Sequence, residues 1–287
     1  MSHSPYGADR TVLVTGATGT TGSRVVSRLT ALGHRVSAAS RRPARPARPG
    51  GAEPVRFDWY DTATHADALR DADRVYLVPP VGEPDPARVM LPFLRQARAA
   101  GVRRAVLLSS SAVPAGGPAV GQVHRELAGL FGEWAVLRPS WFMQNFTGQP
   151  RHVTSIREQG LIFSATGRGR VGFVDADDIA AVAVHSLTDD PAPSGELVIT
   201  GPEALGYDDV AAVITEVTGR PVAHRSLGFE QLRDRLAADL PEEFAALLAG
   251  LDLSIAEGAE DRTTDTVERV TGRPPRAFRA FAEQAMR

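Results

Sequence analysis

Short, nearly continuous apolar runs are spaced along the first two-thirds of the chain, with longer amphipathic stretches between them. Such runs are typical of strands buried on both faces of a sheet. They predict strands over 12–15, 35–39, 54–57, 74–78, 104–109, 135–139 and 196–200. The intervening stretches have helical spacing over 23–32, 66–70, 86–100 and 120–131. This alternation predicts an α/β fold, a Rossmann-type doubly wound parallel sheet with crossover helices.

The alternation loosens after residue 139. A strand end and helix start are expected near 174–180, with Asp177 or Asp178 as the helix cap. Further helices are predicted over 208–218, 229–238, 242–251 and 277–286. We therefore expect a nucleotide-binding domain and a smaller, mostly helical C-terminal lobe that covers the substrate. The expected domains are 10–147 plus 171–200 for the first and 148–170 plus 201–287 for the lobe.

Three glycines with the spacing Gly-x-x-Gly-x-x-Gly follow the first predicted strand and open the first helix. Gly16 permits a tight exit from the strand, Gly19 lets the backbone approach a pyrophosphate, and Gly22 lets the helix lie close to the sheet. The amides and the positive dipole end of that helix then bind the phosphates. The alternative is an ordinary glycine-rich turn.

The second predicted strand is followed by a hydroxyl and two guanidinium groups, those of Ser40, Arg41 and Arg42. An NAD site has a carboxylate here that accepts hydrogen bonds from the ribose diol. Arginine instead binds phosphate oxygens through paired, charge-assisted bonds. We therefore predict NADP(H) as the cofactor. The alternative is that both arginines only begin the proline-rich surface loop over 42–51.

Other strand ends carry further candidates. Asp58 is placed to accept from an adenine amino group, or else it is a turn aspartate. Val78 and Pro79 lie where backbone and apolar atoms line a ribose. Ser109 and Ser110 end the fifth strand, where serines either orient a carbonyl near the nicotinamide or cap a loop.

The chain has no lysine, so the Tyr-x-x-x-Lys pair of common short-chain reductases is excluded. None of Tyr6, Tyr60, Tyr76 and Tyr207 falls in the expected helix. His124 lies there instead and is a candidate proton donor near neutral pH, or else a structural histidine. Hydride acceptors that need little acid assistance remain: a cationic C=N bond, a quinone or an activated enone.

Composition limits the partners, the metal sites and the cellular location to be expected. A net charge of −2 gives no field that favours nucleic acid or a membrane surface. Cysteine is absent and the seven histidines are scattered, so no metal site is expected. No apolar run has the length of a signal core or a membrane span. We expect a cytoplasmic protein, monomer or homodimer, whose partner is a small-molecule substrate.

Motifs in the expected order resemble the NmrA-like branch of the atypical short-chain dehydrogenase/reductases. They cover 15–22, 107–111, 121–124, 137–146, 175–180 and 271–275. The Arg-Pro-Ser-Trp-Phe-Met-Gln-Asn-Phe stretch is rather specific. Within the branch, the chain is most similar to the ergot-alkaloid iminium reductases of the festuclavine and agroclavine dehydrogenase type, with NADPH-dependent quinone and azo reductases as related enzymes.

The resemblance implies roles for particular residues. Thr18, Thr20 and Thr21 would join the three glycines at the pyrophosphate. Pro139, Ser140 and Phe142 would flank the nicotinamide. An apolar wall toward the substrate would be formed by Trp141, Phe142, Met143 and Phe146, although the same side chains also suit core packing.

These observations together predict an NADPH-dependent reductase of specialised metabolism that delivers hydride to an imine, an iminium or a conjugated acceptor. Ser110 and His124 are its candidate catalytic residues. Two alternatives stay open. One is a quinone or azo-compound reductase, and the other is an NmrA-like regulator that binds the dinucleotide without turning it over.

Overall fold

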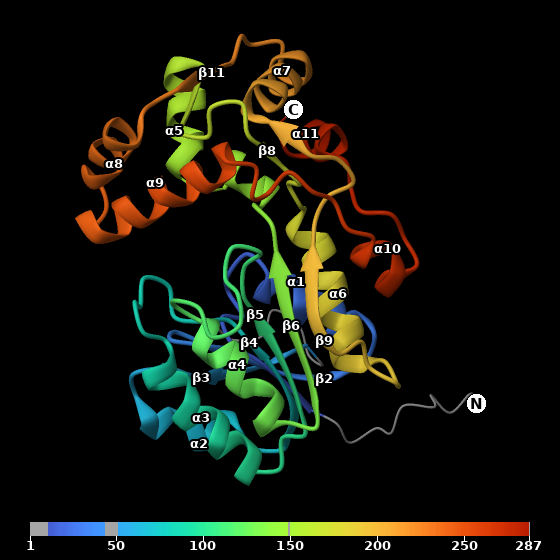
Figure 1. Ribbon diagram of the computed structural model, residues 1–287. Coiled ribbons are helices and arrows are strands. Elements are labelled where there is room, and N and C mark those ends of the chain that lie inside the picture. Colours follow the sequence, from blue (N-terminus) through green and yellow to red (C-terminus); the bar gives the residue numbers. More distant parts are fainter. Residues whose placement is uncertain (1–10, 44–50, 149, 287) are drawn as a thin grey trace. The chain divides into compact units, whose positions relative to one another are not determined.

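The computed structural model describes residues 11–43, 51–148 and 150–286 (Figure 1). It divides into two compact units. The first runs to Arg138 and includes Ile179–Leu197; the second comprises Pro139–Asp178 and the chain from Val198. The domain limits expected from the sequence, 10–147 plus 171–200 and 148–170 plus 201–287, remain a prediction. Most of the proline-rich loop, residues 44–50, lies outside the described residues.

A seven-stranded sheet organises the first unit in the order β3-β2-β1-β4-β5-β6-β9. The neighbours from β3 to β6 pair in parallel. The strands are β1 (Thr11–Val14), β2 (Arg35–Ser40), β3 (Glu53–Arg56), β4 (Ala72–Leu77), β5 (Arg104–Leu108), β6 (Glu133–Pro139) and β9 (Gly195–Ile199). The predicted doubly wound sheet is thus confirmed, with strand ends shifted by at most two residues.

Helices cover both faces of this sheet (Figure 1). The apolar residues of α3 and α4 pack on one face, where Phe93, Leu94 and Leu127 are fully buried. On the other face α1 buries Val25 and Leu29. The helical segments of this part are α1 (Gly22–Ala31), the 3₁₀ turn η1 (Thr62–Thr64), α2 (His65–Ala68), α3 (Ala87–Ala99), α4 (Gly121–Leu130) and α6 (Ala176–Thr188).

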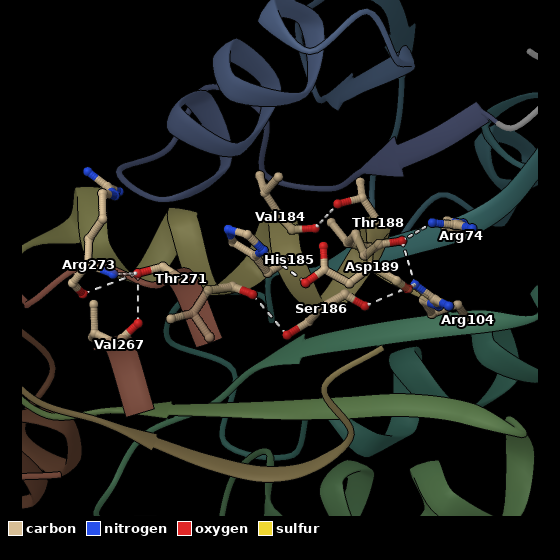
Figure 2. A network of polar contacts seen from close by, with 12 residues as sticks. Arg74, Arg104, Val184, His185, Ser186, Thr188, Asp189, Val267, Thr271 and Arg273 are labelled. Carbon is tan, nitrogen blue, oxygen red and sulfur yellow. Dashed lines mark hydrogen bonds and ion pairs between the residues drawn. The ribbon is translucent and has the colours of Figure 1, made fainter. Parts of the chain in front are cut away.

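Two buried arginines join the amino end of the sheet to the end of α6 (Figure 2). Arg104 donates to the carbonyl oxygens of Leu187 and Asp189, each at 2.9 Å, and Arg74 also donates to the carbonyl of Leu187. These carbonyls lack partners within the helix, and positive charge is favoured at a helix C-terminus. Arg74 and Arg104 are 6% and 3% exposed, so this join is part of the core.

The second unit is mostly helical, with two small two-stranded sheets. Strand β7 pairs in parallel with β11, and β8 pairs antiparallel with β10. Its strands are β7 (Leu161–Ser164), β8 (Arg170–Val171), β10 (Leu205–Gly206) and β11 (Ala223–Ser226). Its helical segments are η2 (Met143–Phe146), α5 (Pro150–Gln159), α7 (Tyr207–Thr218), α8 (Phe229–Ala237), α9 (Glu242–Ala256), α10 (Thr266–Thr271) and α11 (Phe278–Ala285).

The start of α6 differs from the expectation. The backbone N–H of Asp177 donates to Oδ1 of Asp175 at 3.0 Å, so the carboxylate one residue before the helix caps it. The prediction of Asp177 or Asp178 as the cap is therefore wrong. Asp178 is instead bonded through Oδ2 to the backbone N–H of Arg276 at 2.8 Å.

Candidate functional site

The glycine-rich turn lies at the carboxyl ends of β1 and β4, where the strand order changes direction. Gly16 has φ +60°, and an added Cβ would lie 2.9 Å from Cβ of Val78. The amide of Gly19 donates to the carbonyl of Gly16 at 2.8 Å, which closes the turn. Glycine is required here both for the left-handed backbone and for the close approach of β4.

The N-terminus of α1 is open to an anion. Thr21 occupies the N-cap position but its side chain makes no capping hydrogen bond, and the first turn carries no acidic residue. The first amides of a helix have no partners within the helix, and its dipole favours negative charge there. These features fit a pyrophosphate, in the place where dinucleotide folds bind it. The roles of Thr18, Thr20 and Thr21 at the phosphates remain a prediction.

Thr15 joins the two central strands beneath this turn. Its hydroxyl donates to the carbonyl of Tyr76 at 3.1 Å and accepts from the amide of Val78 at 2.8 Å. The indole of Trp59 donates to the carbonyl of Val78 at 3.1 Å. Val78 is therefore held on both sides, and Pro79 follows it. Sequence reasoning predicted Val78 and Pro79 but missed Thr15, which carries no sign of this bridge in its local pattern.

A hollow of about 540 Å³ opens beside the turn. It brings together five predicted cofactor residues from three separate segments: Thr18, Ser40, Arg41, Arg42 and Asp58. Both arginines are exposed. Neither guanidinium forms an ion pair or hydrogen bond with another residue of the described ranges. Two unpaired guanidinium groups and a hydroxyl at the end of β2 match the chemistry of a phosphate monoester.

Asp58 serves the local turn as well as the hollow. Its Oδ1 accepts from the backbone N–H of Tyr60 at 3.0 Å, and its carbonyl oxygen lies 2.9 Å from Nε2 of His65. The two interpretations of this residue are therefore compatible, since Oδ2 is left for a ligand. Its contact with an adenine remains a prediction.

The end of β5 carries Ser109 and Ser110. The backbone N–H of Ser109 donates to the carbonyl of Leu137 at 2.7 Å, and its buried Oγ has no hydrogen-bond partner among the described residues. Oγ of Ser110 accepts from the amide of Ala112 at 3.3 Å, which leaves its own proton for donation. A buried hydroxyl without a partner is costly, so the orphaned Ser109 Oγ fits a ligand that supplies one.

His124 lies in α4 with its side chain only 2% exposed. Its Nε2 is 3.2 Å from Oε1 of Glu196, and its buried Nδ1 has no partner among the described residues. Burial, followed by the positive charge of Arg138, lowers the pKa of His124, although Glu196 opposes the shift. The imidazole is therefore neutral at neutral pH and engaged with a carboxylate, and proton donation by it remains a prediction.

In the second unit, the segment after β6 combines half-buried and core side chains. Trp141 and Phe142 are half-buried, whereas Met143 and Phe146 are 1% and 3% exposed and belong to the unit's aromatic core. Ser140 is buried and its Oγ donates to Oε2 of Glu260 at 3.4 Å. The core-packing interpretation therefore describes Met143 and Phe146. Contacts of this segment with nicotinamide or substrate, including those of Pro139, remain predictions.

A polar clamp holds η2 in place. The side-chain amide of Gln144 donates to Oδ1 of Asp175 at 2.8 Å, and Arg276 donates to Oδ2 of the same carboxylate at 2.8 Å. Asp175 is fully buried. Sequence reasoning placed Gln144 and Asp175 in separate motifs and did not single out Arg276. It missed that the three meet, because the contacts join positions 31 and 101 residues apart.

No cluster of histidine, aspartate or glutamate in the described part of the chain could hold a metal ion. No helix within the described ranges is long and apolar enough to span a membrane.

The chain resembles known proteins in sequence and in fold. A family model described as NAD(P)H-binding matches residues 16–191. The oxidoreductase YesF of Bacillus subtilis is 46% identical over 272 residues, covering 94% of this chain and 93% of that protein. Festuclavine synthase II of Penicillium roqueforti is 38% identical over 287 residues, covering 95% and 97%. The structure of an NADPH-dependent quinone oxidoreductase from Escherichia coli, complexed with NADPH, aligns with a TM-score of 0.80 at 22% identity, covering 96% and 100%.

Proposed function

The chain belongs to the NAD(P)H-binding family of oxidoreductases, and on that premise we propose that it is an NADPH-dependent reductase of iminium or conjugated acceptors. A member of this family with such relatives is an NAD(P)H-dependent reductase. The proposal adds the form of the cofactor and the class of acceptor.

The residues that line the hollow beside the glycine-rich turn support NADPH over NADH as the cofactor. Arg41 and Arg42 present two guanidinium groups, without a partner among the described residues, to a space that Ser40 also lines. A ribose diol would require a carboxylate at the end of β2, and this position has none. The 2′-phosphate that distinguishes NADPH from NADH would meet both guanidinium groups. Asp58, which follows β3 in the chain, also lines the hollow.

The acceptor class follows from what the chain can donate. Bound NADPH supplies a hydride. An iminium carbon that takes up hydride passes its C=N electron pair to nitrogen, which becomes a neutral amine without a proton. A chain without lysine, with a buried neutral His124, suits such an acceptor better than a simple ketone. The likeness to a festuclavine synthase points to the same class.

The contribution of the protein is then chiefly positioning. The orphaned hydroxyl of Ser109 and the free proton of Ser110 orient polar atoms near the end of β5. Trp141 and Phe142 offer apolar surface that the second unit leaves half-exposed. Placing the reacting atoms together and excluding water can by itself account for a large share of a rate enhancement.

Two measurements test the proposal. Isothermal titration should give a Kd for NADPH at least about tenfold below that for NADH, because an added phosphate gains charge-assisted bonds. Turnover should then be compared on a cyclic iminium and a simple quinone, with NADPH oxidation followed at its absorbance maximum. Equal dissociation constants would refute the cofactor assignment. Faster reduction of the quinone would refute the preference for an iminium and favour the quinone-reductase alternative. Binding of NADPH without turnover of either substrate would favour a regulator.

A further inference from the structure

One arginine of β6 donates hydrogen bonds to the loop after β5. Arg138 donates from Nη2 to the carbonyl oxygen of Ser111 at 2.8 Å and from Nε to that of Ser110 at 3.4 Å. Its side chain is 15% exposed. A guanidinium has a fixed fork of donors, so two carbonyls bound by it have little freedom to rotate.

The charge of this arginine is balanced within the same unit. Nη1 of Arg138 lies 2.6 Å from Oε2 of Glu196 in β9, and the other oxygen of that carboxylate lies 3.2 Å from Nε2 of His124. Helix α4, strand β9 and strand β6 are thereby linked to the loop.

The loop also bonds to itself. Oγ and the carbonyl oxygen of Ser110 accept from the amides of Ala112 and Val113 at 3.3 and 3.0 Å. Both oxygens of Ser110 thus accept from backbone amides, and its carbonyl oxygen also accepts from Arg138. These bonds restrict the backbone of the segment Ser109–Ser111, which contains the buried Oγ of Ser109 that has no partner among the described residues.

We propose that Arg138 is a positioning residue for the reduction, holding Ser109 and Ser110 where they meet the nicotinamide or the acceptor. This inference rests on the proposed reductase function. In this role neither Arg138 nor Glu196 needs to contact the reacting groups. Their effect on turnover passes through the backbone of the serine segment.

The same sheet contains a matched control pair at its opposite edge. Arg104 opens β5 and lies 2.5 Å from Glu133 in β6, and it too donates to backbone carbonyls, those of Leu187 and Asp189. Both pairs join an arginine to a partly exposed glutamate, at 54% exposure for Glu133 and 43% for Glu196. They differ in which end of the sheet they hold. Removing Glu133 therefore reports the general cost of losing such a pair.

The experiment compares Arg138→Met, Arg138→Lys and Glu196→Gln with Glu133→Gln. Amide hydrogen exchange of a peptide spanning 108–113 should be at least about tenfold faster in Arg138→Met than in Glu133→Gln, because its carbonyls lose two charge-assisted bonds. At saturating NADPH, kcat should fall about tenfold or more while Kd for NADPH stays within about twofold. Arg138→Lys should recover part of kcat and Glu133→Gln should keep it.

Two outcomes overturn the inference. One is exchange over 108–113 in Arg138→Met that equals that of Glu133→Gln. The other is a kcat that falls equally in both, which indicates general destabilisation. If Arg138→Met does not fold, exchange over 108–113 and kcat are measured in Arg138→Lys and Glu196→Gln instead, and are compared with those of Glu133→Gln. Failure of the wild-type protein to oxidise NADPH would refute the proposed function. Hydrogen exchange needs no hydride acceptor, so it would still test the role of Arg138 in the serine segment.

Discussion

The α-carbon of Gly22 faces the carbonyl oxygen of Gly16 so closely that an added Cβ would lie 2.2 Å from it. The first turn of α1 is therefore fitted onto the glycine-rich turn, with no space for a side chain. This contact sets the distance between the helix N-terminus and the end of β1, and with it the geometry offered to a pyrophosphate.

Gly22→Ala should therefore abolish measurable NADPH binding and lower the melting temperature. The clash is with backbone, so relief requires the turn to move. Gly129→Ala is the matched control: this glycine lies exposed in α4, and an added Cβ meets nothing within 4 Å. That variant should bind NADPH normally and gain about 0.5–1 kcal/mol in unfolding free energy. Tight NADPH binding by Gly22→Ala in calorimetry would contradict this account.

Arg41→Gln and Arg42→Gln should each raise Kd for NADPH by about ten- to a hundredfold, because each removes charge-assisted bonds to the 2′-phosphate. Kd for NADH should change less than about threefold, since that cofactor lacks the phosphate. Fluorescence titration with both cofactors measures the two effects. A parallel loss of affinity for NADH would indicate that the arginines shape the loop instead of reading the phosphate.

Acidification should destabilise the protein through its buried histidines. Burial lowers the pKa of His124 and of His224 below the ordinary value. The unfolded chain therefore takes up protons on these residues near pH 6.5 while the folded protein does not. Their stabilising contribution is complete above about pH 6.5 and is lost as the pH falls toward the lowered values. Melting curves between pH 8 and 5 should show this decline, with a shallower slope in His124→Gln; an unchanged slope would contradict the assignment.

Arg276→Met should lower the unfolding free energy by about 3 kcal/mol, because the fully buried carboxylate of Asp175 loses its charged partner. Arg269→Met provides the comparison. Its partner Asp265 is 78% exposed and 3.6 Å away, so that loss should stay below about 1 kcal/mol. Urea denaturation of both variants checks the difference, and similar midpoints would argue against the clamp as a stabilising contact.

Local pattern predicted the first unit well because its central strands, β1, β4 and β5, are buried on both faces. The apolar runs at Leu13, Val75 and Val106 leave few alternatives to strand, and each ends at a glycine, proline or serine. Ser40, Arg41 and Asp58 could likewise be assigned to one site, since parallel strands end at one edge.

The second unit gave weaker signals. Strands β7 and β11 are short, and β11 reads Ala-His-Arg-Ser with mostly exposed side chains, so neither was predicted. The cap at Asp175 was assigned to its neighbours because any of three nearby aspartates suits a helix start. Contacts such as Arg138 with Glu196 depend on which strands become neighbours, and residues 58 positions apart carry no local trace of that.

Arg74 and Arg104 secure α6 at the amino edge of the sheet, whereas the glycine-rich turn and the serine segment lie at its carboxyl edge. The join between the sheet and α6 thus lies at the opposite edge from the loops predicted to bind the cofactor and the substrate. Substitutions in those loops therefore leave the join between the sheet and α6 intact, whereas a side chain at Gly16 or Gly22 still disturbs the turn itself.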